Sequence, residues 1–307
     1  MTWVSENNLV SAISNAGGFG VLACGAMDCN KLSFEIEKTF EKTSNTFGVN
    51  LIMMHPDIDK LMTVCIKKKV KYVVMAGGFP KKSQIFKLKK KNIKTIAFAS
   101  TLKVAKKMIM NGIDALIIEG SEAGGHIGPV STNVLAQEIL PYIDQVPIFV
   151  AGGVGRGEIM VNYLKLGASG CQIGTRFVCA TESIAHRNFK KIFIKSESRN
   201  AKVSVQLDGR LPVIPVRAIY NKASKDFLIK QQDILIKLDK GEISLNDAKL
   251  QIEHFWSGSL KRAVIDGDIE NGSLMAGQSV SMVSKIEPIQ SIINELVDQA
   301  KLHMEKA

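Results

Sequence analysis

The feature that most constrains the fold of this chain is a short apolar segment that recurs seven times in its first 174 residues. Each segment is rich in β-branched residues and is followed by a small or glycine-rich turn and a longer stretch with helical spacing. The segments are Phe19–Ala23, Val49–Met53, Tyr72–Ala76, Thr95–Ala99, Ala115–Glu119, Ile148–Gly152 and Gly170–Gly174. They are continuously apolar, as is typical of strands buried on both faces, and the intervening helices imply right-handed parallel crossovers. The sequence therefore predicts an α/β fold with a parallel sheet.

The start of the chain decides between the two architectures that such a sheet allows. Seven strands fit an open doubly wound sheet, whereas a closed (β/α) barrel needs eight. The chain opens directly into an amphipathic helix over Glu6–Ala16, with Ser5 as its predicted N-cap and Gly17–Gly18 as its stop. A helix at the front of a βα series implies a strand before it. We therefore expect a TIM (β/α)8-type barrel that lacks its first strand, and a natural start upstream of Met1.

The pattern changes in the last third of the chain. The alternation of strands and helices ends near Phe189, and helical spacing is then found over Lys222–Leu238, Ser244–His254 and Ile286–Glu305. Two regions are predicted on this basis. Residues 1–188 form the barrel core, and residues 189–307 form an appended helical and loop region that packs on the barrel mouth.

Composition excludes several classes of protein. With 46% hydrophobic and 22% charged residues in 307, the chain has the composition of an ordinary soluble protein with a sizeable core. No apolar run approaches the length of a membrane span. The five cysteines are odd in number and lack the spacing of a disulfide framework or, with the histidines, of a metal site. Because no signal sequence opens the chain either, we expect a cytoplasmic protein without a bound metal.

The chain is also basic, with 40 Lys and Arg against 29 Asp and Glu and a net charge of +11. Such an excess favours acidic partners through long-range attraction. However, the lysines occur in short clusters without aromatic residues between them as stacking platforms for bases. A solvated lysine-rich surface is therefore expected, and no nucleic-acid partner.

A histidine stands in the most glycine-rich of the predicted loops. The fifth segment is followed by the loop from Glu119 to Pro129, which reads EGSEAGGHIGP. In a barrel the active site lies at the carboxyl ends of the strands. Gly124 and Gly125 allow close approach to a flat ligand, and His126 follows them directly. A lone histidine is often structural, but its place in this loop favours a functional role.

The next two loops have the composition of a phosphate site. They are AGGVGRG from Ala151 and QIGTR from Gln172. Backbone N–H groups exposed by glycine, the hydroxyl of Thr175 and a helix N-terminus together form an anion site, and the last two strands of a barrel are its usual place. Either loop alone would be a weak signal, because tight turns also use glycine for steric reasons. Their occurrence on consecutive strands favours phosphate binding.

Several segments resemble one known family, and they span nearly the whole chain. The resemblance is to the nitronate monooxygenase (2-nitropropane dioxygenase) family of FMN flavoproteins, which includes the type II enoyl-acyl carrier protein reductases. The matching segments are SNAGGFG from Ser14, GVN from Gly48, Glu119 through Gly128, AGG from Ala151, QIGTRF from Gln172, VRAI from Val216 and NGSLMAGQ from Asn271. In one respect the chain departs from the family. Members open with a strand that ends in a Gln-Gly-Gly-Met turn at the flavin, and only Met1 of that turn is present.

The resemblance implies a cofactor and a set of residues that bind it. FMN would lie across the barrel mouth of the 1–188 core, with its phosphate on the Gly152–Gly153 and Gly174–Thr175 loops. The other residues implied as cofactor contacts are Asn50, Gly78, Glu119, Gly124, Gly125 and Gln172, together with Met275 and Gln278, which would close over the isoalloxazine. His126 matches the family's active-site histidine, which handles a proton of the substrate or holds its polar group. A homodimer is implied as well.

Two reactions are compatible with this resemblance. In the first, FMN takes electrons from an alkyl nitronate and then reacts with O2. In the second, NADH or NADPH reduces FMN, which then reduces the conjugated C=C bond of an enoyl-acyl carrier protein. The segments from Val216 and Asn271 and the +11 charge, which suits an acidic carrier protein, favour the second, whereas the loop around His126 is typical of proteins assigned to the first. A third possibility is a phosphate-ligand binding protein without catalysis on the same scaffold.

Overall fold

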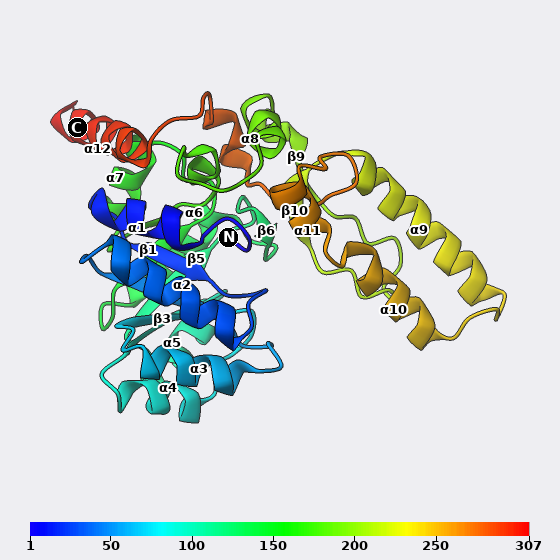
Figure 1. The fold of residues 1–307 in the computed structure, drawn as a ribbon, viewed down its shortest axis with the longest axis horizontal. Helices are drawn as coiled ribbons and strands as arrows, with labels where there is room; N and C mark the ends of the chain where they lie inside the picture. The colour runs from blue at the N-terminus through cyan, green and yellow to red at the C-terminus, as the bar shows by residue number, and fades with distance from the viewer. Residues whose placement is uncertain (307) are drawn as a thin grey trace.

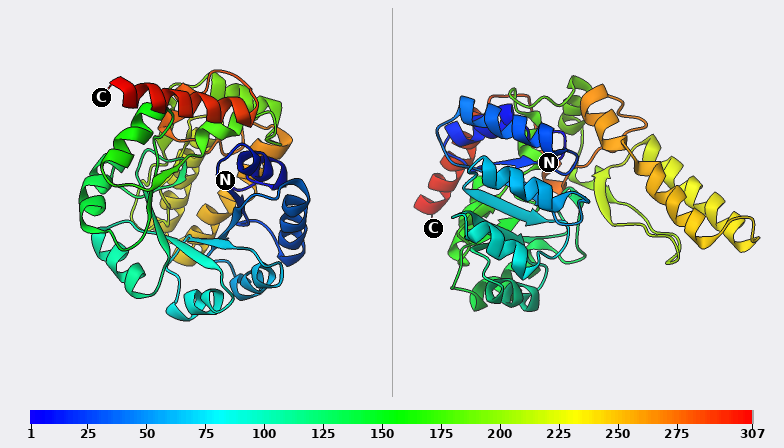
Figure 2. Two further views of the ribbon diagram at one scale, coloured as in Figure 1. Left: turned by 90° about the vertical axis from the view of Figure 1, so that its left-hand side faces the viewer. Right: turned by 60° about the horizontal axis from the view of Figure 1, so that its bottom comes forward.

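A curled parallel sheet surrounded by helices forms the larger part of the molecule (Figures 1 and 2). The computed structural model describes residues 1–306. The sheet has the order β1-β2-β3-β4-β5-β7-β8, and every pair in it is parallel. Its strands are β1 Gly20–Ala23, β2 Phe47–Ile52, β3 Tyr72–Ala76, β4 Lys94–Phe98, β5 Ala115–Glu119, β7 Ile148–Ala151 and β8 Gly170–Gln172. The predicted parallel α/β barrel with seven visible strands is confirmed.

Burial on both faces of the sheet explains why its strands are continuously apolar. Alternate side chains such as Leu116 and Ile118 point outward into the large core beneath the helices. Their neighbours Ala115 and Ile117 point into the barrel, where they form a smaller cluster with Val74 and others. A strand buried on both faces is therefore apolar along most of its length.

The helices that follow the strands form the outer ring, which Figure 2 shows end-on. They are α1 Asn7–Asn15, α2 Cys29–Lys42, α3 Ile58–Lys67, α4 Lys82–Lys89, α5 Leu102–Met110, α6 Thr132–Ile139 with the 3₁₀ turn Leu140–Tyr142, α7 Gly157–Lys165 and α8 Arg187–Ile194. The predicted N-cap of the first helix is wrong. The Glu6 carboxylate, not Ser5, accepts hydrogen bonds from the N–H groups of Asn8 and Leu9.

The two edges of the sheet, β1 and β8, flank the first residues of the chain. The carbonyl of Ser5 accepts a hydrogen bond from the N–H of Ala23 at the end of β1. The Met1 sulfur lies beside Gly174, just after β8; a Cβ added there would be 3.5 Å from it. The segment from Met1 to Ser5 therefore lies between the carboxyl ends of the two edge strands.

The chain after α8 contains strands that the sequence pattern did not indicate. β9 Ala201–Val203 and β10 Val216–Ile219 join β6 Gly125–His126 in a three-stranded antiparallel sheet, which we call the ribbon. The other elements are the 3₁₀ turns η2 Thr175–Cys179, η3 Ser198–Asn200 and η5 Gln278–Met282, the π turn η4 Arg262–Asp266, and the helices α9 Lys222–Asp239, α10 Leu245–Trp256, α11 Ser259–Lys261 and α12 Ile289–Lys306. Within residues 1–306, no helix has the length and hydropathy needed to cross a membrane.

These late elements take different places around the barrel. Helices α9 and α10 form an antiparallel hairpin, which we call the arm, and it projects away from the barrel (Figure 1). Helix α12 packs against α7 and α1 on the barrel wall. A buried guanidinium holds it there, because Arg176 donates to the carboxylates of Glu287 and Glu295 at 3.0 and 2.6 Å.

Candidate active site

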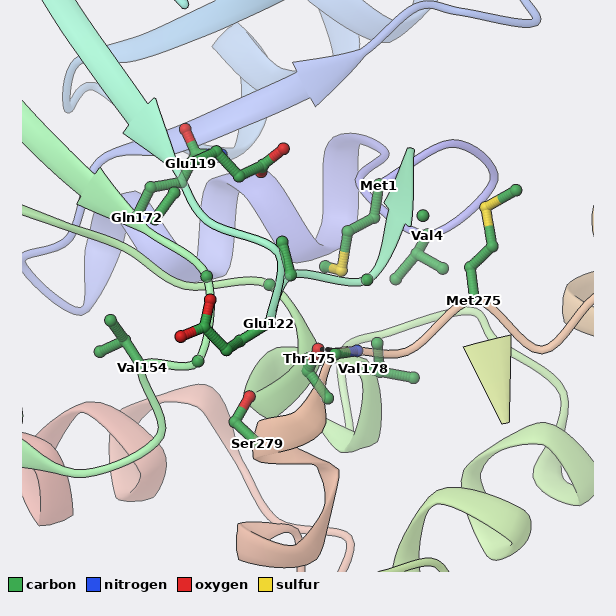
Figure 3. Close-up of a pocket in the computed structure, with 18 of the residues that line it drawn as sticks. Met1, Val4, Glu119, Glu122, Val154, Gln172, Thr175, Val178, Met275 and Ser279 are labelled. Carbon is green, nitrogen blue, oxygen red and sulfur yellow. Dashed lines mark hydrogen bonds between the residues drawn. The ribbon is translucent and has the colours of Figure 1, made fainter. Parts of the chain in front are cut away.

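A cavity of about 210 Å³ opens at the carboxyl ends of β5, β7 and β8 (Figure 3). Its walls come from the loops that follow these three strands, from the first residues of the chain and from the loop before η5. In a (β/α) barrel this end of the sheet carries the active site. The cavity is therefore the candidate active site.

Glycine is required at the turn after β7. Gly152 and Gly153 have φ of +94° and +71°, a region that other residues rarely adopt. A Cβ on Gly152 would also stand 2.9 Å from the Thr132 hydroxyl and 3.0 Å from the Gly120 carbonyl oxygen. Within residues 1–306, the N–H of Gly153 has no hydrogen-bond acceptor. The turn therefore has a free backbone donor in a residue that lines the cavity, as an anion site needs.

The loop before η5 closes the cavity from the opposite side. The N–H of Gly277 donates to the Thr175 hydroxyl at 2.9 Å, and the N–H of Gln278 donates to the Glu122 carbonyl at 2.9 Å. A Cβ on Gly124 would lie 2.6 Å from the Ala276 carbonyl carbon. Because Thr175 accepts from Gly277, its own hydroxyl proton is free to be donated to a ligand.

Two carboxyl groups line the cavity in different electrostatic settings. The Glu122 carboxylate accepts hydrogen bonds from the N–H and hydroxyl of Thr132, at 2.9 and 3.0 Å, so the start of α6 stabilises its charge. Glu119 is the last residue of β5, and its carboxyl group makes no hydrogen bond within residues 1–306. Removal from water raises its pKa to about 7, although the nearby Met1 ammonium acts in the opposite direction.

His126 lies at a second pocket that adjoins the first. It belongs to β6, where it pairs with Val216 of β10. The second pocket has a volume of about 340 Å³, and Met275 and Leu260 line both spaces. The imidazole remains accessible to solvent, but partial desolvation lowers its pKa below the ordinary value. The lowered pKa favours an uncharged imidazole near pH 7. An uncharged ring can donate a hydrogen bond through one nitrogen and accept one through the other.

The structure brings most of the predicted site residues together. The predicted residues that line the cavity are Glu119, Gly124, Gly125, Gly152, Gly153, Gln172, Gly174, Thr175 and Met275. Four others lie outside its lining. His126 lines the second pocket, Asn50 lies near the end of β2, Gly78 is exposed after β3, and Gln278 takes part through its backbone. Their contacts with a cofactor stay predictions.

Sequence reasoning did not single out several residues that shape the site. Glu122 and Ser279 line the cavity. Arg217 ties the ribbon to the β5 loop, because its guanidinium donates to the carbonyls of Ser121 and Ala201 at 2.8 and 2.6 Å. Of these residues, the sequence could have indicated Glu122 alone. It is a carboxylate in the loop before Ser131 and Thr132, where a helix begins, and a helix N-terminus favours negative charge. The contact from Arg217 to Ser121 joins residues 96 positions apart, so no local pattern contains it.

Comparison with known proteins places this site in a family. A family model for nitronate monooxygenase matches residues 1–62 and 55–299. The chain belongs to the nitronate monooxygenase family. The resemblance inferred from the sequence is thereby confirmed, and the protein is an oxidoreductase.

Solved and curated relatives differ in what they act on. The structure of FabK from Thermotoga maritima, a type II enoyl-acyl carrier protein reductase, has a TM-score of 0.88 and 34% identity and covers 100% of this chain and 92% of that one. A probable nitronate monooxygenase of Staphylococcus aureus is 28% identical, over 83% of this chain and 85% of that protein. A third relative is the (3aS,4S,5R,7aS)-5-hydroxy-7a-methyl-1-oxo-octahydro-1H-indene-4-carboxyl-CoA dehydrogenase of Rhodococcus jostii, 35% identical over 68% of this chain and 59% of that protein.

The cavity suits the flavin that members of this family generally use. A mononucleotide needs backbone donors and a hydroxyl for its phosphate, and the free Gly153 N–H and the Thr175 hydroxyl are groups of this kind. It also needs room beside the backbone, and Gly124, Gly125 and Gly152 line the cavity without a side chain. The residues present therefore fit the group.

Proposed function

We propose that this chain binds FMN in the cavity and reduces the conjugated C=C bond of an enoyl thioester, with NADH or NADPH as the electron donor. The observation that carries the proposal is the apolar second pocket, which adjoins the cavity at Met275 and Leu260. An alkyl nitronate of a few carbons would leave most of its 340 Å³ empty, whereas an acyl chain would fill it.

The position of each residue in the two pockets indicates its role in this reaction. Bound FMN supplies the transfer of two electrons between the nicotinamide and the C=C bond. Gly153 and Thr175 hold its phosphate and so fix its place at the mouth. His126 stands at the edge of the second pocket, and its neutral ring donates a hydrogen bond to the thioester carbonyl. The C=C bond also takes up two protons, one that the nicotinamide gives up with the two electrons and one from solvent.

A second candidate reaction is oxidation of an alkyl nitronate with O2. The match to the nitronate monooxygenase family model and the similarity to the Staphylococcus aureus proteins favour it. The same cavity and the same histidine would serve this reaction. It differs from the first in needing neither a nicotinamide nor an acyl chain.

The test is flavin absorbance of the FMN-loaded protein under anaerobic conditions. We expect NADH or NADPH to bleach the flavin and a 2-enoyl thioester to restore its colour. Flavin that ignores both nucleotides but is bleached by an alkyl nitronate would contradict the reductase proposal and establish the second candidate. Failure to bind FMN at all would contradict both.

His126 gives the matching variant. We expect His126→Ala to lower turnover by about 10²-fold or more while FMN stays bound. His303→Ala is the control, because His303 lies on α12 beside Asn162, away from both pockets. Unchanged turnover of His126→Ala would remove this histidine from the mechanism.

A further inference from the structure

The second pocket lies between the ribbon and the arm. β9, β10 and the loop that joins them form one wall, and Phe227 and Leu228 of α9 with Ile252 and Trp256 of α10 form the other. The arm projects from the barrel (Figure 1), and the arm residues that line this pocket do not line the candidate active site. A ligand that reaches it must have a long part remote from the reacting atoms.

The two ends of the pocket differ. Near the barrel, Met275 and Leu260 line both this pocket and the cavity, and His126 stands at the boundary. Toward the arm, Phe227 and Ile252 belong to the arm's own apolar core, where they are 2% and 3% exposed. The Phe227 ring packs against Phe255 and Trp256 with centroids 5.1 Å apart. The pocket therefore ends against a closed, well-packed wall.

The lining selects an uncharged apolar ligand. Among the described residues that line the pocket, Lys202 is the one with a formal charge, and its ammonium stands over the Tyr220 ring, 4.9 Å from the centroid. Burying a second charge among valines, isoleucines and aromatic rings would be costly without a partner. A nucleotide or a carboxylate is thus a poor occupant, whereas a hydrocarbon chain gains the full free energy of leaving water.

The volume sets a length for this chain. A cavity of about 150 Å³ in another protein holds benzene, so 340 Å³ has room for roughly ten to fourteen carbons. We propose that the pocket takes the acyl chain of the substrate and that Phe227 and Ile252 of the arm set the longest chain that fits. This inference rests on the proposed reduction of enoyl thioesters and specifies the class of acyl group.

The test measures binding separately from catalysis. The probes are saturated acyl thioesters of N-acetylcysteamine with 4 to about 16 carbons, which cannot be reduced, titrated calorimetrically into FMN-loaded protein. We expect Kd to fall about fourfold for each added methylene group. The fall should stop at roughly twelve carbons, where the pocket is full.

Two variants move this limit in opposite directions. Phe227→Ala removes the end wall and should extend the limit by roughly four carbons. Leu228→Phe narrows the pocket from a half-buried position outside the arm's core and should shorten it. Ile236→Ala is the control, because this α9 side chain is 53% exposed and does not line the pocket. Because Phe227→Ala removes packing, Leu228→Phe provides the test if the first variant fails to fold.

The outcomes separate this inference from the proposed function. Affinity that is independent of chain length, or a limit that Leu228→Phe leaves unchanged, would overturn the role of the arm, even if 2-enoyl thioesters are reduced. A limit that moves as expected supports that role. If protein with such a limit fails to reduce 2-enoyl thioesters, the proposed reaction fails and with it the assignment of the acyl chain to an enoyl substrate, while the length limit set by the arm stands.

Discussion

The carboxyl group of Glu119 should make the flavin-free protein less stable as the pH rises. Desolvation raises its pKa from 4.5 to about 7, so the folded state binds a proton more tightly than the unfolded state. Well above pH 7 the carboxyl group is ionised in both the folded and the unfolded state. The difference of about 2.5 between its two pKa values then lowers the free energy of unfolding by about 3 kcal/mol. At pH 5 the folded state keeps its proton, and the cost falls to about 1 kcal/mol.

The variant Glu119→Gln removes this titration while keeping the shape of the side chain. We expect it to be more stable than the natural protein by about 3 kcal/mol at pH 8.5 and by about 1 kcal/mol at pH 5. The measurement is urea unfolding of flavin-free protein at both pH values, with Glu305→Gln at the exposed end of α12 as the control. An advantage of the same size at both pH values would refute the assignment of the raised pKa to Glu119.

Two further substitutions test the framework around the site. Arg176→Met removes the buried guanidinium from Glu287 and leaves Lys285, 3.2 Å from that carboxylate, as its remaining cation; we expect urea unfolding to show a loss of about 3 kcal/mol, and a loss below about 1 kcal/mol would contradict a buried ion pair. Gly152→Ala forces a positive φ and places a Cβ near Thr132, so we expect a stability loss of about 1–2 kcal/mol from the backbone alone and weaker FMN binding. Gly167→Ala is the control. Gly167 has φ of +103° and open space around it, so this variant should lose stability through backbone strain but keep its affinity for FMN.

The barrel was predictable from the sequence because both faces of its sheet are buried. The segments Tyr72–Ala76 and Ala115–Glu119 were predicted with the bounds that β3 and β5 have in the structure. The ribbon escaped prediction for the opposite reason. β9 and β10 have three and four residues, and a charged side chain, Lys202 in β9 and Arg217 in β10, interrupts the apolar pattern of each. β6, which pairs with β10, has two residues within a loop, so this pairing is fixed by tertiary contacts alone.

The candidate site divides in the same way. The glycines after β7 and β8 were recognisable because a tight strand-to-helix turn and an anion site both require glycine within a few consecutive residues. The bond from Gly277 to Thr175 joins residues 102 positions apart, and no local pattern contains it. The same holds for the second pocket, since its walls come from β6, the ribbon loop and the arm. The predicted Ser5 cap failed because a neighbouring carboxylate reaches the same N–H groups.

The two pockets are built in ways that tolerate change differently. Around the cavity, the fit depends on backbone against backbone, so a Cβ on Gly124 or Gly277 would force the loops apart. In the second pocket the walls are side chains such as Leu228 and Val203, which can change in volume while the backbone stays in place. A change of substrate is therefore easier to achieve through the arm and ribbon than through the cavity. We expect variants of the arm to alter which acyl chains bind while leaving FMN affinity unchanged, because among the described residues Met275 and Leu260 alone line both spaces, and neither belongs to the arm.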